Sequence, residues 1–105
     1  MSTTKDFIEY VCEQISGVGA VRYRKMFGEY MVYVNEKPLL LVCDNTVYVK
    51  EHEAIIDKMK SAEKGFPYSG AKEHYVLDID NSEFSKEVIA IFEPYIAIPK
   101  PKKKS

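Results

Sequence analysis

The stretch that decides the fold of this chain is Met26-Phe27-Gly28-Glu29-Tyr30-Met31-Val32-Tyr33-Val34. Its second half, residues 30–34, is rich in aromatic and β-branched residues and therefore predicts a β-strand. A glycine interrupts the strand pattern, and a glycine in that position usually marks a β-bulge or a close approach of the backbone. We expect Gly28 to lie at a bulge or tight strand junction, with Phe27 turned inward.

The residues before this stretch predict one amphipathic helix followed by a short strand. Apolar side chains recur at helical spacing through residues 4–16, and Thr3 or Thr4 can cap the start of that helix. Gly17 and Gly19 should end it, because glycine readily adopts the left-handed backbone of a helix C-terminus. Residues 21–27 then predict a short strand that leads into a sheet.

The residues after this stretch predict two further strands, at 39–43 and 46–50, separated by turns at 35–38 and 44–45. Connections this short join only antiparallel neighbours, so the three strands should form a meander. A second helix should open at residues 50–53 and stop at Gly65, and residues 66–70 should form a loop or a short edge segment. A strand at 74–78 precedes a final helix, with Ser82 as the expected N-cap and Pro94 near its end.

The summed order is α-β-β-β-β-α-β-α, which predicts an α+β fold. We expect a two-layer sandwich in which helices cover one face of a mainly antiparallel sheet. The chain of 105 residues is long enough for one core, so residues 1–98 should form a single domain. Residues 99–105 should be a disordered tail, and it is basic, with Lys100, Lys102, Lys103 and Lys104. Residues 1–99 accordingly carry a net charge of −5, although that of the whole chain is −1.

The apolar pattern and the cysteines predict the compartment of the protein. No window approaches the roughly 20 apolar residues of a membrane span, and the N-terminus shows no secretory signal. We therefore expect a cytoplasmic protein that does not associate with membranes. Cys12 and Cys43 both lie inside apolar patterns, which favours free buried thiols rather than a disulfide framework.

The residues that could carry chemistry do not form a recognisable constellation in the sequence. His52 and His74 lie on different predicted elements, and a metal site needs at least three converging ligands. Neither Cys12 nor Cys43 has an accessible position beside a base, as a nucleophile would require. We therefore expect no catalytic, metal-binding or cofactor-binding residues.

Two groups of residues indicate a surface for binding instead. Arg22, Arg24 and Lys25 interleave with aromatic side chains, a pattern that can hold nucleic acid through phosphate contacts and base stacking. The sequence pI of about 6.1 lies below the range that is typical of dedicated nucleic-acid-binding domains. Glu29 and Lys50 belong to one meander, and we expect them to form a salt bridge at one rim of the sheet or to face a ligand there.

Tyrosine suits half-buried faces and interfaces, since its ring is apolar and its tip is polar. If tyrosines face outward from the uncovered side of the sheet, that side is a natural surface for a partner protein or a second copy. The complete candidate interaction surface comprises Arg22, Arg24, Lys25, Glu29, Tyr30, Tyr33, Tyr48 and Lys50.

The sequence Arg24-Lys25-Met26-Phe27-Gly28-Glu29-Tyr30, together with Thr46-Val47-Tyr48-Val49-Lys50, resembles a known family. It is similar to the N-terminal domain of the TfoX/Sxy competence regulators, which also occurs as a small stand-alone protein. The resemblance covers most of residues 4–97 and implies an α+β sandwich like that of the secretion-chaperone-like group.

The resemblance also implies a function. It indicates a non-enzymatic regulatory or interaction module that acts through protein contacts and has no catalytic residues to transfer. The alternative is a nucleic-acid-binding accessory protein that uses Arg22, Arg24, Lys25 and the lysine tail. The chain departs from the family in two respects: it stops before the C-terminal helical domain of the full-length regulators, and Met31 stands where the family often has a small residue. We therefore do not expect a complete competence activator.

Overall fold

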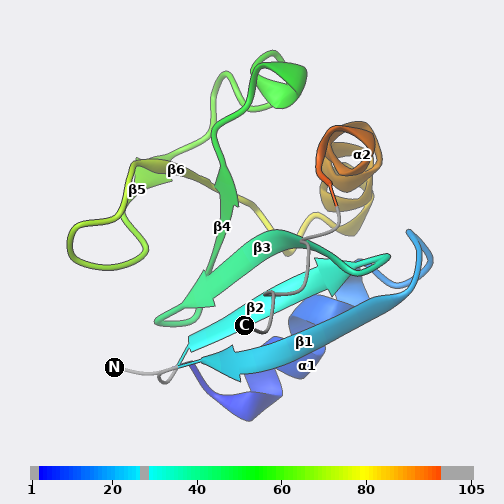
Figure 1. The fold of residues 1–105 in the computed structure, drawn as a ribbon, viewed down its shortest axis with the longest axis vertical. Helices are drawn as coiled ribbons and strands as arrows, with labels where there is room; N and C mark the ends of the chain where they lie inside the picture. The colour runs from blue at the N-terminus through cyan, green and yellow to red at the C-terminus, as the bar shows by residue number, and fades with distance from the viewer. Residues whose placement is uncertain (1–2, 27–28, 98–105) are drawn as a thin grey trace, which may run out of the picture.

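A six-stranded antiparallel sheet organises the protein, in a computed structural model that describes residues 3–26 and 29–97. The elements in chain order are α1 (Lys5–Gln14), β1 (Val21–Met26), β2 (Glu29–Val34), β3 (Lys37–Cys43), β4 (Thr46–Lys50), the 3₁₀ helix η1 (Glu53–Ile55), β5 (Lys64–Gly65), β6 (His74–Val76), α2 (Ser82–Phe92) and the 3₁₀ helix η2 (Glu93–Tyr95). The strands lie side by side in the order β1-β2-β3-β4-β6-β5 (Figure 1). The predicted α+β class is confirmed. The junction predicted at Phe27 and Gly28, and the predicted tail, fall outside the described residues.

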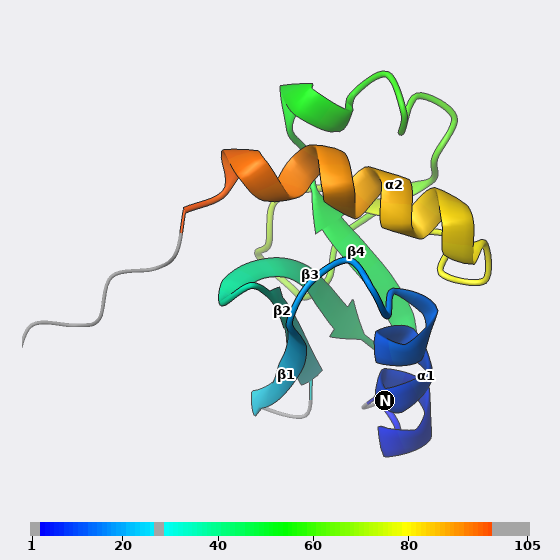
Figure 2. The same ribbon diagram turned by 90° about the vertical axis from the view of Figure 1, so that its right-hand side faces the viewer.

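Both α-helices pack on the same face of the sheet, as predicted. Side chains alternate along β2, so that Tyr30, Val32 and Val34 are buried, whereas Met31 and Tyr33 are only half-buried. The buried set joins one core cluster, to which α1 contributes Ile8, Val11 and Ile15 and α2 contributes Val88, Ile89 and Phe92. Figures 1 and 2 show α1 behind β1 and β2, while α2 crosses beside β3 and β4. The result is the expected two-layer arrangement.

Helix α1 begins and ends as its sequence predicts. The hydroxyl oxygen of Thr4 accepts a hydrogen bond from the Phe7 backbone N–H at 3.2 Å, which satisfies one donor that the helix leaves open. Gly17 follows the helix at φ 101°, a left-handed conformation that side chains disfavour. Within the described residues, no helix is both long enough and apolar enough to cross a membrane.

Two tight turns build the β2–β3–β4 meander. Asn35 and Glu36 have φ angles of 53° and 68°, and Asp44 and Asn45 have φ angles of 52° and 55°. Two consecutive left-handed residues define the type I′ turn, whose twist matches that of the flanking strands. The meander predicted from residues 30–50 is therefore confirmed, and the turn predicted at residues 35–38 is shortened to the two residues 35–36.

The bulge in the described part of the sheet lies between β2 and β3. Val32 pairs with Leu40, but the next residue, Tyr33, pairs with Pro38, so Leu39 is the extra residue. Proline has no N–H to give to a central ladder, and a bulge is one of the few places where a sheet accepts it. The bulge also lets Leu39 and Leu40 both be buried, although they are consecutive.

The prediction of a second helix from residue 50 to Gly65 is wrong. This segment forms only η1 followed by turns, and its last two residues form the short strand β5. Ile55 and Met59 are buried, but Ile56 between them is 53% exposed. Two buried residues give a helix little packing, and most of the stability of a protein helix comes from the packing of its apolar face.

The sequence predicted Ser82 as the N-cap of α2, but the N-cap in the structure is Asn81. The side-chain oxygen of Asn81 accepts a hydrogen bond from the Phe84 N–H at 3.1 Å. The Ser82 hydroxyl instead donates to the backbone oxygen of Gln14 at 2.6 Å, which ties α2 to the end of α1. Pro94 lies in η2 directly after α2, in agreement with the expectation that it ends the helix.

Candidate interaction surfaces

The face of the sheet opposite the two helices carries one continuous cross-strand row of side chains. Strand register places Arg24 beside Met31, Met31 beside Leu41, Leu41 beside Tyr48, and Tyr48 beside Val76. Arg24 at the end of the row is exposed, and the other four side chains are half-buried. We call the surface formed by these five residues the open face. It presents apolar side chains on a surface that neither α-helix covers.

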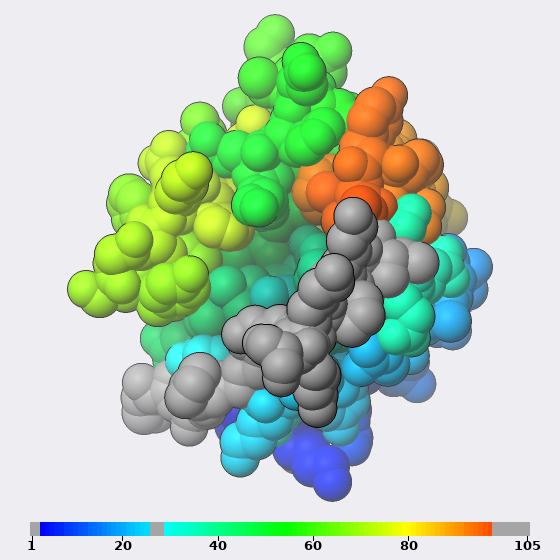
Figure 3. All heavy atoms as spheres, in the orientation of Figure 1, coloured from blue at the N-terminus to red at the C-terminus, as the bar shows by residue number. Residues whose placement is uncertain are grey.

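The open face contains a groove of about 670 Å³. Met31, Leu41 and Tyr48 line its floor, and the segment from Tyr68 to His74 lines one wall. Figure 3 views the molecule from this side and shows the centre of the face, in the green of β3 and β4, deeper than the yellow-green lobe that precedes β6. The volume falls within the range of about 300–1,000 Å³ that is usual for ligand sites.

Arg22 lies on the same side of the sheet and is held there by two neighbours. Its guanidinium donates to both carboxylate oxygens of Glu36 at 2.8–3.2 Å and lies 4.3 Å from the centre of the Tyr33 ring. The hydrogen bond to Glu36 raises the pKa of Arg22, and the same bond lowers the pKa of Glu36. Of the candidate cations, Arg22 is therefore already engaged within the molecule.

The predicted basic cluster divides between the two faces of the sheet. Arg22 and Arg24 belong to the open face, but Lys25 pairs with Tyr30 and shares the helix side with it. Tyr30 is only 6% exposed, and its ring meets that of Tyr23 edge-on at 5.4 Å. The structure therefore separates Lys25 and Tyr30 from the other candidate residues.

The prediction of a salt bridge between Glu29 and Lys50 is wrong. A carboxylate oxygen of Glu29 accepts hydrogen bonds from the Asp44 N–H at 3.3 Å and the Thr3 hydroxyl at 3.5 Å. Glu29 thus lies at the turn that joins β3 to β4, whereas Lys50 is the last residue of β4 and pairs with His74. Because β4 runs away from that turn along its whole length, the two charges lie at opposite ends of the strand.

Sequence reasoning missed Leu41 and Val76 as parts of the open face. Residues 39–43 form an almost continuous apolar run, which had indicated a strand buried on much of both faces. Counting outward from the two-residue turn at residues 44–45 pairs Leu41 with Tyr48, as the structure confirms. Turn geometry is the signal that could have placed Leu41 on the same face as Tyr48.

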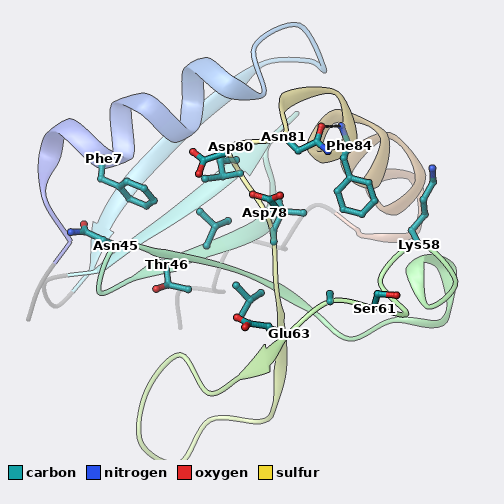
Figure 4. A pocket seen from close by; sticks show the side chains of 15 residues that line it. Phe7, Asn45, Thr46, Lys58, Ser61, Glu63, Asp78, Asp80, Asn81 and Phe84 are labelled. Carbon is teal, nitrogen blue, oxygen red and sulfur yellow. Dashed lines mark hydrogen bonds between the residues drawn. The ribbon is translucent and has the colours of Figure 1, made fainter.

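A second concave region, the helix-side cleft, lies between α1, the β3–β4 turn and the segment that follows β6 (Figure 4). Phe7 from α1 and Phe84 from α2 line its two ends, and both side chains are half-buried. The carboxylates of Glu63, Asp78 and Asp80 lie at its exposed rim. Its volume is also about 670 Å³. This cleft is therefore acidic at the rim, in contrast to the arginines beside the open face.

Two polar side chains of the cleft are already engaged with neighbouring elements. The Tyr10 hydroxyl donates to a carboxylate oxygen of Asp80, which raises the pKa of Tyr10. Lys58 forms an ion pair with Glu87 at 2.7 Å. The first contact ties α1 to the segment before α2, and the second ties the turns after η1 to α2, so both are explained by the packing of the fold.

The titratable side chains of the described residues offer no assembled reactive centre. Within residues 3–26 and 29–97, His, Cys, Asp and Glu form no group of three or more that could hold a metal ion. Burial, followed by the nearby Glu29 carboxylate, raises the pKa of Cys43 to about 12. Burial also raises the pKa of Cys12, which is half-buried rather than fully buried as predicted. Both shifts favour the protonated thiol over the reactive thiolate.

Comparison with known proteins gives two matches. The TfoX N-terminal domain matches residues 13–99 of this chain. An uncharacterized 12.7 kDa protein in the trpE 5′ region of Spirochaeta aurantia is 31% identical over 105 residues, which cover 98% of this chain and 91% of that protein. Both matches run through the sheet and α2. The chain belongs to the TfoX N-terminal domain family.

Proposed function

We propose that this chain is a non-enzymatic, TfoX-like regulatory domain that binds a partner protein through its open face. Membership of the TfoX N-terminal domain family supports a regulatory role. The observation that carries the choice of surface is the half-buried row of Met31, Leu41 and Tyr48, which lies on the side of the sheet opposite both α-helices. Apolar side chains gathered on one exposed face favour contact with another macromolecule.

The composition of the open face agrees with that of a protein interface. Its centre is apolar and aromatic, and its periphery carries the charged residues Arg24 and Lys50, both of which are exposed. Protein interfaces typically combine an apolar, aromatic centre with a polar rim. The concave groove allows a convex partner element to exclude water from Leu41 and Tyr48 together.

The test replaces one residue of the floor of the groove with a charged residue. Leu41→Lys places an unpaired ammonium in the centre of the surface, and Ile56→Lys is the matched control, because Ile56 is an exposed apolar residue, 53% accessible, outside the open face. Partners are captured on immobilised protein from a lysate of the source cells and quantified by mass spectrometry. Circular dichroism melting verifies that both variants fold.

We expect a partner that the unaltered protein and Ile56→Lys retain equally, and that Leu41→Lys loses by at least about tenfold, since burying an unpaired charge costs several kcal/mol. Light scattering distinguishes a second copy of this chain from a different protein. Equal capture by Leu41→Lys and the unaltered protein would contradict the proposal.

Nucleic acid is the competing ligand, and a direct titration separates it from a protein partner. Labelled DNA and RNA are titrated at low and moderate salt against the unaltered protein and a variant with Arg22, Arg24 and Lys25 changed to alanine. Because Lys25 lies on the other face from the two arginines, we expect no tight binding that depends on all three. Binding that falls steeply with salt and is lost in the variant would replace the protein-partner proposal.

A further inference from the structure

Strand β1 forms one edge of the sheet, and its outer backbone groups can be identified from the register. The Asn35 N–H donates to the Ala20 oxygen at 2.8 Å, and the β1–β2 register continues from that pair. In an antiparallel ladder, hydrogen-bonded pairs alternate with non-bonded pairs, so Arg22 and Arg24 turn their backbone groups toward β2. The N–H and C=O groups of Val21, Tyr23 and Lys25 consequently point away from the sheet.

Those outward groups have no backbone partner among residues 3–26 and 29–97. The opposite edge differs, because β5 contains only two residues, Lys64 and Gly65. An exposed edge strand of six residues is a template on which another extended chain can add. Of the two edges, β1 is the one that offers a full row of donors and acceptors.

We propose that β1 accepts an extended, acidic segment of the partner protein as an additional strand of the sheet. This inference rests on the proposed function and names both the binding mode and the chemistry of the partner. The added strand continues the sheet past Arg24, so the bound segment lies at the border of the open face. Main-chain hydrogen bonds supply the affinity in this mode, and alternate side chains supply the specificity.

The charge of β1 selects an acidic occupant over a second copy of this chain. Arg22 and Arg24 lie on one face of the strand, so an antiparallel pairing of β1 with itself that uses the outward groups and is centred on Arg22, Tyr23 or Arg24 sets arginine opposite arginine. Like charges directly opposite each other destabilise a strand pair, whereas opposite charges stabilise it. Since Arg22 is bound to Glu36, Arg24 is the main cation that an incoming carboxylate meets.

The other face of β1 selects apolar side chains at the alternate positions. Val21 and Tyr23 are half-buried and pack against the core cluster beneath the helices. An incoming strand places the side chains between its acidic residues directly beside Val21 and Tyr23. The fitting segment therefore alternates carboxylate and β-branched residues, as in a chain of alternating Glu and Val.

A labelled peptide of alternating Glu and Val tests this prediction by fluorescence anisotropy with the full chain. The first variant is Lys25→Pro, which removes one outward N–H without removing a hydrogen bond to β2, a change that edge strands tolerate. Its matched control is Lys25→Ala, which removes the same charge and keeps the N–H. Circular dichroism melting establishes that both variants keep their fold.

We expect the peptide to bind the unaltered protein with a Kd below about 1 mM, the weak end of specific affinities. Lys25→Pro should weaken binding by about tenfold, because the bound strand loses one main-chain hydrogen bond, and Lys25→Ala by less than about threefold, because an exposed charge pair contributes less than a hydrogen bond. Arg24→Glu should weaken binding of the Glu–Val peptide by about tenfold. The same variant should bind a peptide of alternating Lys and Val more tightly than the unaltered protein does. A variant with Lys102, Lys103 and Lys104 changed to alanine should bind as the unaltered protein does.

Amide hydrogen exchange distinguishes strand addition from contacts made through side chains alone, because only strand addition forms hydrogen bonds to the outward backbone amides. The peptide should slow exchange at the outward amides of Val21, Tyr23 and Lys25 and leave the amides of Arg22 and Arg24 as they were. Absence of binding, or binding that Lys25→Pro leaves unchanged, overturns the inference. If the natural partner is captured through Leu41 while Lys25→Pro has no effect on it, the proposed function stands and this strand-addition mode fails.

Discussion

At the scale of single residues, Cys43 shows how burial sets chemical behaviour. Its side chain is 2% exposed, and burial together with the Glu29 carboxylate raises the pKa of the thiol to about 12. We predict that the native protein at pH 8 reacts with a disulfide reagent at Cys43 only through unfolding, so that the rate rises steeply with denaturant. Cys12→Ala isolates the signal of Cys43 for this measurement. Rapid, denaturant-independent labelling of the native variant would contradict the assignment.

A second residue-scale prediction concerns acid stability and the ion pair between Lys37 and Glu93. The two charges lie 2.8 Å apart, and the hydrogen bond from Lys37 holds the pKa of Glu93 below its usual range. A carboxylate whose pKa is lowered on folding stabilises the folded state above its unfolded pKa, and this stabilisation is lost as the pH falls through the folded pKa. Glu93→Gln should therefore lower the melting temperature at pH 7, and this difference should shrink as the pH falls below the usual pKa of about 4.3 toward the lower pKa of Glu93 in the folded protein.

The matched control for this prediction is Glu87→Gln. Glu87 also pairs with a lysine, Lys58, at 2.7 Å, but its side chain is 60% exposed against 22% for Glu93. Exposed ion pairs contribute little to stability, so Glu87→Gln should change the pH dependence of melting less than Glu93→Gln does. Identical pH profiles of the melting temperature for the two variants would contradict the prediction that the Lys37–Glu93 ion pair contributes more to stability than the exposed Lys58–Glu87 pair.

At the scale of elements, the start of α2 provides a clear test of the local hydrogen bonds. Asn81→Ala removes the acceptor for the Phe84 N–H, and such caps contribute about 1 kcal/mol to stability. Asn81→Asp keeps an acceptor at the same place and should stay within about 0.5 kcal/mol of the unaltered protein. Urea unfolding of the variants measures both differences. The reverse order of stability would show that Asn81 does not cap α2.

The sequence predicted correctly the elements that local periodicity and turn chemistry determine, and it failed where tertiary packing decides the structure. The helix from residue 5 to residue 14 and the three strands of the meander follow from periodicity and turn chemistry, and the structure confirms them. The segment after β4 contains apolar residues at helical spacing, but only Ile55 and Met59 reach the core, and this depends on how tertiary packing places the segment. For that reason its pattern indicated a helix that the fold does not form.

The capping error had a similar cause. Asn81 and Ser82 are both good N-cap residues, so the sequence around them does not decide between the two. The structure decides because the Ser82 hydroxyl finds an acceptor in Gln14, which is distant in sequence. A long-range hydrogen bond of this kind leaves no signal in a local pattern.

At the scale of the whole molecule, the candidate surface could be predicted only in part. The sequence predicted tyrosines on the uncovered side of the sheet, and Tyr33 and Tyr48 lie on that side. It also grouped Lys25 with Arg22 and Arg24, although adjacent residues of a strand face opposite sides. The bulge at Leu39 and the assignment of Glu29 to the β3–β4 turn needed the three-dimensional register.

The central claim is that this domain acts by binding a partner protein through its open face, and NMR mapping tests it most directly. Once the partner has been captured, it is titrated into isotope-labelled protein, and the backbone amide shifts are followed residue by residue. We predict that the largest changes occur at Met31, Leu41 and Tyr48 and extend to Arg24, while the outer side of α2 and the helix-side cleft near Phe7 stay unchanged. Changes confined to the helix-side cleft, with the amides of Met31, Leu41 and Tyr48 unmoved, would contradict the claim.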